Sequence, residues 1–451
     1  MKNLMISPSG IRGVVGESLT PQLALEVGMS FGNLMGKGPV VVGGDTRTSH
    51  DTFMAAVISG LQAVGTDVIA IGKVTTPTVQ QLIKIHQAKG GIVITASHNP
   101  IIWNGLKLMN HSGSFLTDNE YDTFISHYEN KTFKLSNWDN QGNITHDLKA
   151  LEKHVDLILD KIDTSIIKSS NLKVLIDANN GTGALANPIL LDKLGISYKL
   201  LNSEPNGVFD HDPEPLEKNL SKIIKELKTG DYDIGFVQDA DADRLVILDE
   251  NGRFIGEDYS LAFCVDYILN YEQKSRSQKD VVVNLSTSKI IEDIATKAAA
   301  TIYQTKIGEP NVTAKLKELN AVVGGEGNGG IIYPSIGWGR DSLVGIVISL
   351  KYLAETKKSV SEIISTYPQY KMVREKFAVN NKQEVSDFLT KVDNHFSKEF
   401  NLDKQDGVKV LFNTGWIHVR PSNTEPIIRI FIEEKSIERA NDLFKEVISL
   451  K

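Results

Sequence analysis

The hydrophobic positions of the chain fall into short strand-like runs that alternate with longer helical segments. Residues 90–94 form an apolar run with the length of a buried strand, whereas residues 148–162 space their apolar side chains as a helix does. Alternation of this kind is typical of α/β domains with largely parallel sheets. The pattern therefore predicts an α/β protein.

One order of elements occurs three times. Each copy predicts a strand ending in a polar loop, a second strand, and a third strand that ends in the most unusual loop of the copy, with helical stretches between them. The copies comprise residues 39–47, 67–77 and 90–100, then 172–183, 197–207 and 232–252, and finally 280–289, 300–310 and 320–334. The repeat predicts three related domains.

After residue 370 the order changes to a strand, a helix, three strands and a helix, which predicts a small α+β domain. The helical segments 148–162 and 257–269 are expected at domain junctions. The predicted domains are residues 1–147, 148–254, 255–368 and 369–451.

Composition and charge narrow the class of protein. A chain of 451 residues exceeds what one core usually supports, so several domains are expected. Its 41% hydrophobic and 23% charged residues are typical of a folded globular protein rather than a disordered one. The net charge of −7 argues against a nucleic-acid partner. An anionic ligand would therefore have to meet local basic residues.

The single cysteine and the apolar runs indicate the compartment. Cys264 lies in an apolar stretch and has no second cysteine for an intramolecular disulfide, so we interpret it as a buried side chain in a reducing cytosol. No run approaches the roughly 18 apolar residues of a membrane span, and residues 1–10 lack the hydrophobic stretch of a signal peptide. We expect a cytoplasmic protein with no membrane partner.

The third strand of the second copy ends in an acidic loop, residues 239–244. Asp239, Asp241 and Asp243 alternate, so in an extended segment their carboxylates project to one side and repel one another. A hard divalent cation resolves this, and Mg²⁺ is the usual choice. A solvated surface turn is a poor alternative between apolar strands. An EF-hand fails because Arg244 stands where that loop needs glycine. The loop predicts a metal site.

The corresponding loop of the third copy, residues 324–330, is rich in glycine. It matches the G-x-G-x-x-G dinucleotide fingerprint, but residues 331–334 read as a strand, whereas the fingerprint has to open a helix. We interpret it as a flexible loop that brings backbone and the Glu326 carboxylate close to a polyhydroxy ligand. A plain tight turn is the alternative.

A basic loop, residues 420–429, lies in the last domain. Guanidinium groups and hydroxyl donors gathered in one loop suit the oxygens of a phosphate dianion. The alternative is a capped turn with a salt bridge to Glu425. The residues concerned are Arg420, Ser422, Asn423, Thr424 and Arg429.

The third strand of the first copy ends in the Ser97 loop, residues 95–100. His98 next to Ser97 suggests a hydrolase dyad, but neighbouring side chains on an extended chain point to opposite faces, and no G-x-S-x-G elbow surrounds the serine. A turn before Pro100 explains the loop equally well. By itself the Ser97 loop is therefore ambiguous.

Together and in this order, eight segments resemble signature segments of the α-D-phosphohexomutase superfamily, and the likeness spans essentially the whole chain. The resemblance implies three related mixed α/β domains plus a C-terminal α+β domain around a central cleft. The segments are SGIRG (9–13), GGDTRTS (43–49), TASHNP (95–100), NGLKL (104–108), DADADR (239–244), TKIG (305–308), GGEGNGG (324–330) and RPSNTEP (420–426).

The resemblance also implies residue roles. Ser97 is carried as phosphoserine and, with Asp239, Asp241 and Asp243, holds Mg²⁺. The glycine loop, with Glu326 and Asn328, reads sugar hydroxyls, and the basic loop grips the phosphate of the substrate. The remaining expected site residues are Arg12 and Lys107 for proton transfer, His98 as a further candidate, Arg244 on the phosphoryl group and Lys306 on the substrate.

The activity implied by the resemblance is a hexose phosphomutase. Such an enzyme interconverts a hexose 6-phosphate and 1-phosphate through a hexose 1,6-bisphosphate, which also serves as primer. Many members read Ser-Gly-His after the sugar-loop glutamate, whereas this chain carries Gly330 in place of the histidine. This form resembles a subset described as phosphoglucosamine mutases or mixed phosphoglucomutase/phosphomannomutases.

Glucosamine phosphate is therefore the first expectation, with phosphoglucomutase/phosphomannomutase activity as the alternative. Two other classes stay open. One is a phosphatase with Asp239 or Asp241 as nucleophile, and the other is a non-catalytic protein that binds sugar phosphates. We expect a monomer or a homodimer with a small sugar phosphate as partner.

Overall fold

Three of the four sheets share one topology, as the repeated strand order predicts. The structure is a computed structural model that describes residues 4–422 and 426–451. In each of the three sheets the first strand of the copy lies between the second and the third, all parallel, and an antiparallel fourth strand pairs with the third. The predicted fold class is confirmed, and an antiparallel strand lies beside the third strand of each copy.

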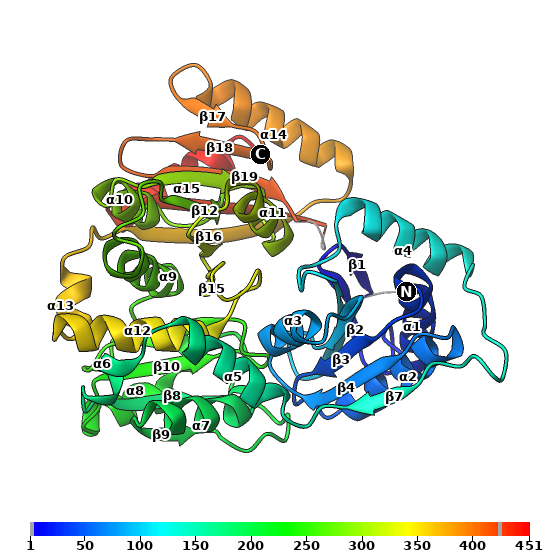
Figure 1. Cartoon of the computed structure of the whole chain (residues 1–451). Coiled ribbons are helices and arrows are strands. Elements are labelled where there is room, and N and C mark those ends of the chain that lie inside the picture. Colours follow the sequence, from blue (N-terminus) through cyan, green and yellow to red (C-terminus); the bar gives the residue numbers. More distant parts are fainter. Residues whose placement is uncertain (1–3, 423–425) are drawn as a thin grey trace.

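The first sheet, at the right of Figure 1, has seven strands in the order β1-β2-β6-β5-β3-β4-β7. Its strands are β1 Met5–Ser7, β2 Gly10–Val14, β3 Val40–Gly44, β4 Val68–Lys73, β5 Gly90–Ile94, β6 Trp103–Asn110 and β7 Ile144–His146. Its helices are α1 Pro21–Met35, α2 His50–Ala63, α3 Thr76–Ile85 and α4 Asp118–Asn130.

The second and third sheets have four strands each, in the orders β11-β10-β8-β9 and β13-β12-β14-β15. The second contains β8 Lys173–Asp177, β9 Ser197–Leu201, β10 Ile234–Gln238 and β11 Leu245–Leu248, with α5 Ala150–Lys161, α6 Ser165–Lys168, α7 Gly183–Leu194, η1 Glu217–Asn219 and α8 Ser221–Thr229. The third contains β12 Asp280–Asn284, β13 Thr301–Thr305, β14 Val323–Glu326 and β15 Gly330–Ile332, with α9 Glu257–Tyr267, η2 Ile268–Glu272, α10 Ile290–Lys297, α11 Glu309–Leu319, α12 Ser342–Thr356 and α13 Val360–Ser365.

The fourth sheet is antiparallel, with the order β16-β20-β19-β18-β17, and it lies next to the third sheet at the top of Figure 1. Its strands are β16 Lys371–Ala378, β17 Asn401–Asp403, β18 Val408–Leu411, β19 Trp416–Pro421 and β20 Ile427–Glu434, with helices α14 Lys382–Phe396 and α15 Ile437–Ser449. This is the α+β domain predicted from the sequence.

The hydrophobic core is continuous between the second and third sheets. One cluster joins Phe236 of β10 and Leu190 of α7 to Phe263 of α9 and Val283 of β12, and α12 is buried over residues 342–354. The first and fourth sheets pack into separate clusters. The second and third sheets therefore share one hydrophobic core.

In all three related sheets, the loop that connects the third strand to the fourth carries the unusual residues found in the sequence. These connections are the Ser97 loop between β5 and β6, the acidic loop between β10 and β11, and the glycine loop between β14 and β15. Carboxyl ends of parallel strands are where α/β sheets usually place ligands. Among the described residues no helix is long and apolar enough to cross a membrane.

Candidate active site

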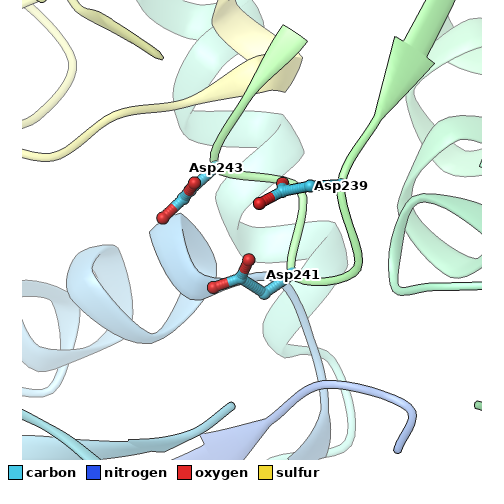
Figure 2. A group of neighbouring side chains, drawn as sticks. All are labelled: Asp239, Asp241 and Asp243. Atoms are coloured by element: carbon cyan, nitrogen blue, oxygen red, sulfur yellow. The ribbon is translucent and has the colours of Figure 1, made fainter. Parts of the chain in front are cut away.

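The acidic loop gathers its three carboxylates at one buried point. Asp239, Asp241 and Asp243 are each at most 1% exposed, one oxygen from each lies within 4.8 Å of the others, and the side chains converge in Figure 2. Asp241 Oδ1 and Asp243 Oδ1 are buried and have no hydrogen-bond partner within residues 4–422 and 426–451. Buried carboxylate oxygens without donors fit a hard divalent cation such as Mg²⁺.

Ser97 reaches this cluster from the first sheet. Its hydroxyl donates a hydrogen bond of 2.8 Å to Asp239 Oδ2. The residue has a φ of +51°, in the left-handed region that side chains other than glycine rarely adopt. The Thr95 hydroxyl stabilises this conformation by accepting a 2.8 Å bond from the Ser97 backbone N–H. The serine and the acidic loop therefore meet at a single site.

Arg47 holds the Ser97 loop in place. Its guanidinium donates to the backbone carbonyls of Ser97 at 2.8 Å and Asn99 at 2.7 Å, and to those of Pro100 and Trp103 at 2.9 Å each. Its Nε pairs with Asp45 at 3.1 Å. Arg47 lies in the segment GGDTRTS, but the sequence alone predicted no role for it. A guanidinium is the side chain with enough fixed donors for four carbonyls at once.

The structure corrects one geometric step of the sequence reasoning. The Ser97 loop is not extended, and His98 Nδ1 lies 3.3 Å from Ser97 Oγ. A serine–histidine dyad is still absent, because Arg244 Nη2 donates to His98 Nδ1 at 2.8 Å and the serine proton points to Asp239. Burial, with the charges of Arg244 and Arg12 next in size, holds the pKa of His98 well below its usual value.

Lys107, on β6, contacts two carboxylates of the acidic loop. Its ammonium donates to Asp241 Oδ2 at 2.7 Å and to Asp243 Oδ2 at 2.9 Å. Burial acts to lower the pKa of Lys107, but the two carboxylates outweigh it and the pKa is raised. Lys107 therefore holds its proton at neutral pH.

The carboxylates of the acidic loop differ in their surroundings. Burial, followed by the charges of Asp241 and Asp243, raises the pKa of Asp239 well above its usual value. Burial also acts to raise the pKa of Asp243, but Arg340 and Lys107 outweigh it and lower that pKa. A cation bound between the carboxylates would favour the ionised form of all three.

The glycine loop leads from β14 into the strand β15 and not into a helix, so it is not a dinucleotide fingerprint. The Glu326 carboxylate accepts hydrogen bonds from Asn284 Nδ2 at 2.9 Å and Arg340 Nη1 at 3.1 Å. Asn328 is half-buried next to it. The glycines allow close packing on protein neighbours: a Cβ at Gly329 would lie 2.4 Å from the carbonyl oxygen of Leu245.

A cleft of about 1000 Å³ joins the first, third and fourth sheets. Arg420 and Arg429, directly opposite each other on β19 and β20, lie along it. Arg420 Nε also donates to Asp406 Oδ2 at 2.9 Å, and the same oxygen accepts the backbone N–H of Ile307 at 3.1 Å. The predicted site residues that line the cleft are Arg12, His98, Arg420, Ser422 and Arg429.

Lys306 is exposed and is not among the residues that line the cleft, although its neighbours Ile307 and Gly308 are. Asn423 and Thr424 lie outside the described residues, as does Glu425 of the alternative capped turn. For this loop the structure therefore bears only on Arg420, Ser422 and Arg429.

Two further groups at the acidic loop were missed. Thr76 donates to Asp241 Oδ2 at 2.5 Å, and Arg340 donates to Asp243 Oδ2 at 2.7 Å. Thr76 gives no signal in the sequence, because it is a threonine at the first position of α3, directly after the cap residue Thr75. Arg340 and Asp341 directly precede the apolar run 342–354. Charged residues beside an apolar helix of that length are a usable signal of a buried ion pair.

Sequence comparison matches domains of one family in order along the chain. Residues 5–135, 152–252 and 256–370 match the descriptions "Phosphoglucomutase/phosphomannomutase, alpha/beta/alpha domain" I, II and III. Residues 375–450 match the C-terminal domain of the same family.

Relatives align over nearly the full length, and two of them are 36% identical to this chain. A probable phosphoglucosamine mutase of Methanopyrus kandleri is 36% identical over 98% of this chain and 96% of its own length. A phosphoglucomutase/phosphomannomutase of Thermococcus kodakarensis is 36% identical over 98% of this chain and 97% of its own. Among solved structures, a phosphoglucomutase/phosphomannomutase family protein of Burkholderia thailandensis superposes with a TM-score of 0.85 at 25% identity, covering 98% of each chain.

Proposed function

The chain belongs to the phosphoglucomutase/phosphomannomutase family of the α-D-phosphohexomutase superfamily, and from this premise we propose that it interconverts glucosamine 6-phosphate and 1-phosphate through a phosphoserine at Ser97. Members of this family are isomerases that move a phosphate within one sugar. The observation that carries the phosphoserine assignment is the 2.8 Å contact between Ser97 Oγ and Asp239 Oδ2.

Charge explains why the serine and the acidic loop belong together. A phosphoserine carries about −1.5 to −2 charges at neutral pH, which would be strongly repelled by three adjacent carboxylates. We assign Mg²⁺ to Asp239, Asp241 and Asp243, with an oxygen of Ser97 or its phosphate completing the set. Bound there, the ion would neutralise this charge and polarise the transferring group.

The proposed reaction has two phosphoryl transfers. A hydroxyl of the hexose monophosphate attacks the phosphorus on Ser97, the bond from phosphorus to Ser97 Oγ breaks, and the hydroxyl proton is passed on to Oγ. The hexose 1,6-bisphosphate then reverses its orientation in the cleft. Its other phosphate is transferred to Ser97 by the reverse of the first step. The same bisphosphate primes unphosphorylated enzyme.

The side chains divide the work. Lys107, which holds its proton, is suited to protonate the leaving Ser97 oxygen, and Arg12 and His98 are the other proposed proton-transfer groups. We assign Arg244 to the transferring phosphoryl group. The distal phosphate is assigned to the basic loop, Arg420, Ser422, Asn423, Thr424 and Arg429, and the sugar to Glu326, Asn328 and Lys306.

Family members with histidine at the position of Gly330 have a sugar contact that this chain lacks, which favours a different substrate class. The relative from Methanopyrus kandleri is named a probable phosphoglucosamine mutase. The alternative, supported by the second relative, is a phosphoglucomutase/phosphomannomutase. Coupled assays with the 1-phosphates of glucosamine, glucose and mannose, each with Mg²⁺ and bisphosphate primer, test both. A kcat/KM for glucosamine 1-phosphate below that of the other two would contradict the first choice.

Labelling separates the mutase from a phosphatase. With a ³²P-labelled hexose 1,6-bisphosphate, we expect acid-stable label on Ser97, since phosphoserine resists acid. Acid-labile label on Asp239 or Asp241 would instead indicate an aspartyl nucleophile. Binding of sugar phosphates with no turnover under primed conditions would indicate a non-catalytic binding protein.

A further inference from the structure

Arg340 binds three buried carboxylates from three different segments. Its Nη2 donates to Asp243 Oδ2 of the acidic loop at 2.7 Å, its Nη1 to Glu326 Oε2 at 3.1 Å, and its Nε to Glu309 Oε2 at 2.9 Å. The side chain is 8% exposed. The next residue, Asp341, caps α12, so the arginine starts from a fixed backbone. One guanidinium therefore ties the acidic loop to the glycine loop.

The stem of Arg340 occupies the space that a side chain at position 330 would need. Gly330 lies directly opposite Glu326 in the β14–β15 pair, so a side chain there would stand beside the glutamate. A Cβ built on Gly330 would be 2.2 Å from Arg340 Cδ and 2.9 Å from Cγ. An arginine held at one contact can swing aside, but this one is held by three carboxylates.

Arginine is the residue type that fits this position. Its planar fork presents donors in fixed directions, whereas the ammonium of a lysine is one compact charge that cannot reach three separated carboxylates. The glycine loop also rests on the end of the acidic loop, where Leu245 N–H donates to Gly329 O at 3.0 Å. A displacement of either loop would therefore be transmitted to the other.

We infer that Arg340 is a positioning residue that fixes the Glu326 carboxylate relative to Asp243, and that position 330 is glycine because the Arg340 stem fills its side-chain space. The inference rests on the proposed function in one respect, the assignment of Glu326 to the sugar. In this chain the side chain that lies beside Glu326 is thus Arg340, which comes from another segment, and not a side chain at position 330. The relative placement of sugar and phosphoryl group is set by that side chain.

Thermal unfolding tests the steric part without any assay of activity. We expect Gly330→Ala to lower the apparent Tm by several degrees in the wild-type background and to have little further effect when added to Arg340→Ala. Arg340→Ser is the second background, because it also lacks the Cδ that a Cβ at position 330 would meet, and its hydroxyl can still donate to a carboxylate if Arg340→Ala fails to fold. Losses that simply add in either of these backgrounds would overturn the pairing of Gly330 with Arg340.

Steady-state kinetics test the positioning role. We expect Arg340→Lys to raise KM for the sugar phosphate about tenfold, the effect of weakening one charge-assisted contact, with a smaller change in kcat. In a Glu326→Gln background the same change is expected to have almost no further effect on KM, because Arg340 acts through Glu326. An equal rise in both backgrounds would overturn the inference.

Arg276→Lys is the matched control, since Arg276 is an exposed arginine whose Nη2 donates to Asn320 O. Its KM and Tm are expected to equal those of the wild type. If wild-type protein turned over none of the sugar phosphates, the proposed function would fail, and the unfolding cycle of Gly330 and Arg340 would still decide the steric pairing.

Discussion

Ser97 is the residue in which backbone and chemistry are most tightly connected. Its left-handed φ of +51° turns the hydroxyl toward Asp239 instead of along the strand direction of β5. Strained backbone of this kind persists where the surrounding structure enforces it, and it is common at functional sites. The loop contacts of Arg47 and Thr95 supply that enforcement.

We expect Ser97→Ala to abolish mutase turnover while binding of the sugar phosphate is retained, because the change removes the phosphoryl carrier and leaves the basic loop intact. Coupled assays measure the first and isothermal titration calorimetry the second. Ser275→Ala, at an exposed serine, is the control. Turnover near the wild-type rate in Ser97→Ala would exclude the phosphoserine mechanism.

At the acidic loop, Asp241→Asn is expected to weaken Mg²⁺ binding at least tenfold, a loss of ~1.4 kcal/mol or more. The reason is that a neutral amide replaces a charged ligand whose Oδ1 is buried and free of hydrogen bonds within the described residues. Calorimetric titration with MgCl₂ measures the change. Asp231→Asn, an exposed aspartate paired with Lys173, serves as control, and equal affinities in the two variants would contradict the metal site.

The sequence predicted which residues form this site better than it predicted how their side chains are oriented. The alternate spacing of Asp239, Asp241 and Asp243 is local, so it could be interpreted without a fold. The contact between Ser97 and His98 was misjudged because a left-handed residue is not recognisable from a serine in the sequence. Arg340 was missed because its partners come from distant segments.

At the scale of elements, the site is built by one connection used three times, the turn from a buried parallel strand into an antiparallel neighbour. Hydrophobic runs predicted β5, β10 and β14, since these strands are apolar or glycine-rich up to the last residue of each. The strand β6 was not assigned, because Asn104, Gly105 and Lys107 interrupt its apolar pattern. The polar residues of β6 that contribute to the site thus prevent its recognition as a strand from the hydrophobic pattern.

The conformation of the whole Ser97 loop depends on Arg47. We therefore expect Arg47→Lys to lower kcat at least tenfold. A lysine cannot supply four carbonyls, and each buried acceptor left without a donor costs about 1–3 kcal/mol. The loop should then leave the conformation that presents Ser97. Measuring kcat together with far-UV circular dichroism distinguishes this local change of the Ser97 loop from unfolding of the whole protein. An unchanged kcat in a folded variant would contradict the positioning by Arg47.

At the scale of the whole molecule, several polar contacts attach the fourth sheet to the third. Arg374 pairs with Glu257 and Asp258 at 3.0 Å each, and Lys409 donates to the carbonyl of Leu285 at 2.7 Å. His418 Nδ1 contacts the Ser286 hydroxyl at 2.9 Å. Polar contacts of this type depend on the protonation of their members.

We expect this attachment to weaken in mild acid. Burial, which outweighs the carbonyl and carboxyl of Asp406, lowers the pKa of His418 from 6.5 to about 4. The unfolded chain takes up a proton as pH falls below 6.5, whereas the folded chain does so only near 4, so stability is lost across that window. Burial likewise lowers the pKa of His50 to about 4 and adds to the effect.

Thermal unfolding between pH 7 and 4 measures this loss. His418→Gln, which keeps a donor and an acceptor but does not titrate, is expected to flatten the dependence on pH compared with the wild type. A dependence identical to that of the wild type would contradict the role of His418.

The core shared by the second and third sheets determines how this protein can be divided. The helix α12 is buried between the second and third sheets. A fragment that contains only one of these sheets would therefore expose a long apolar helix to water and precipitate. Only a piece that spans both, close to residues 148–368, has a prospect of folding in isolation. The three related domains thus do not correspond to three separable parts.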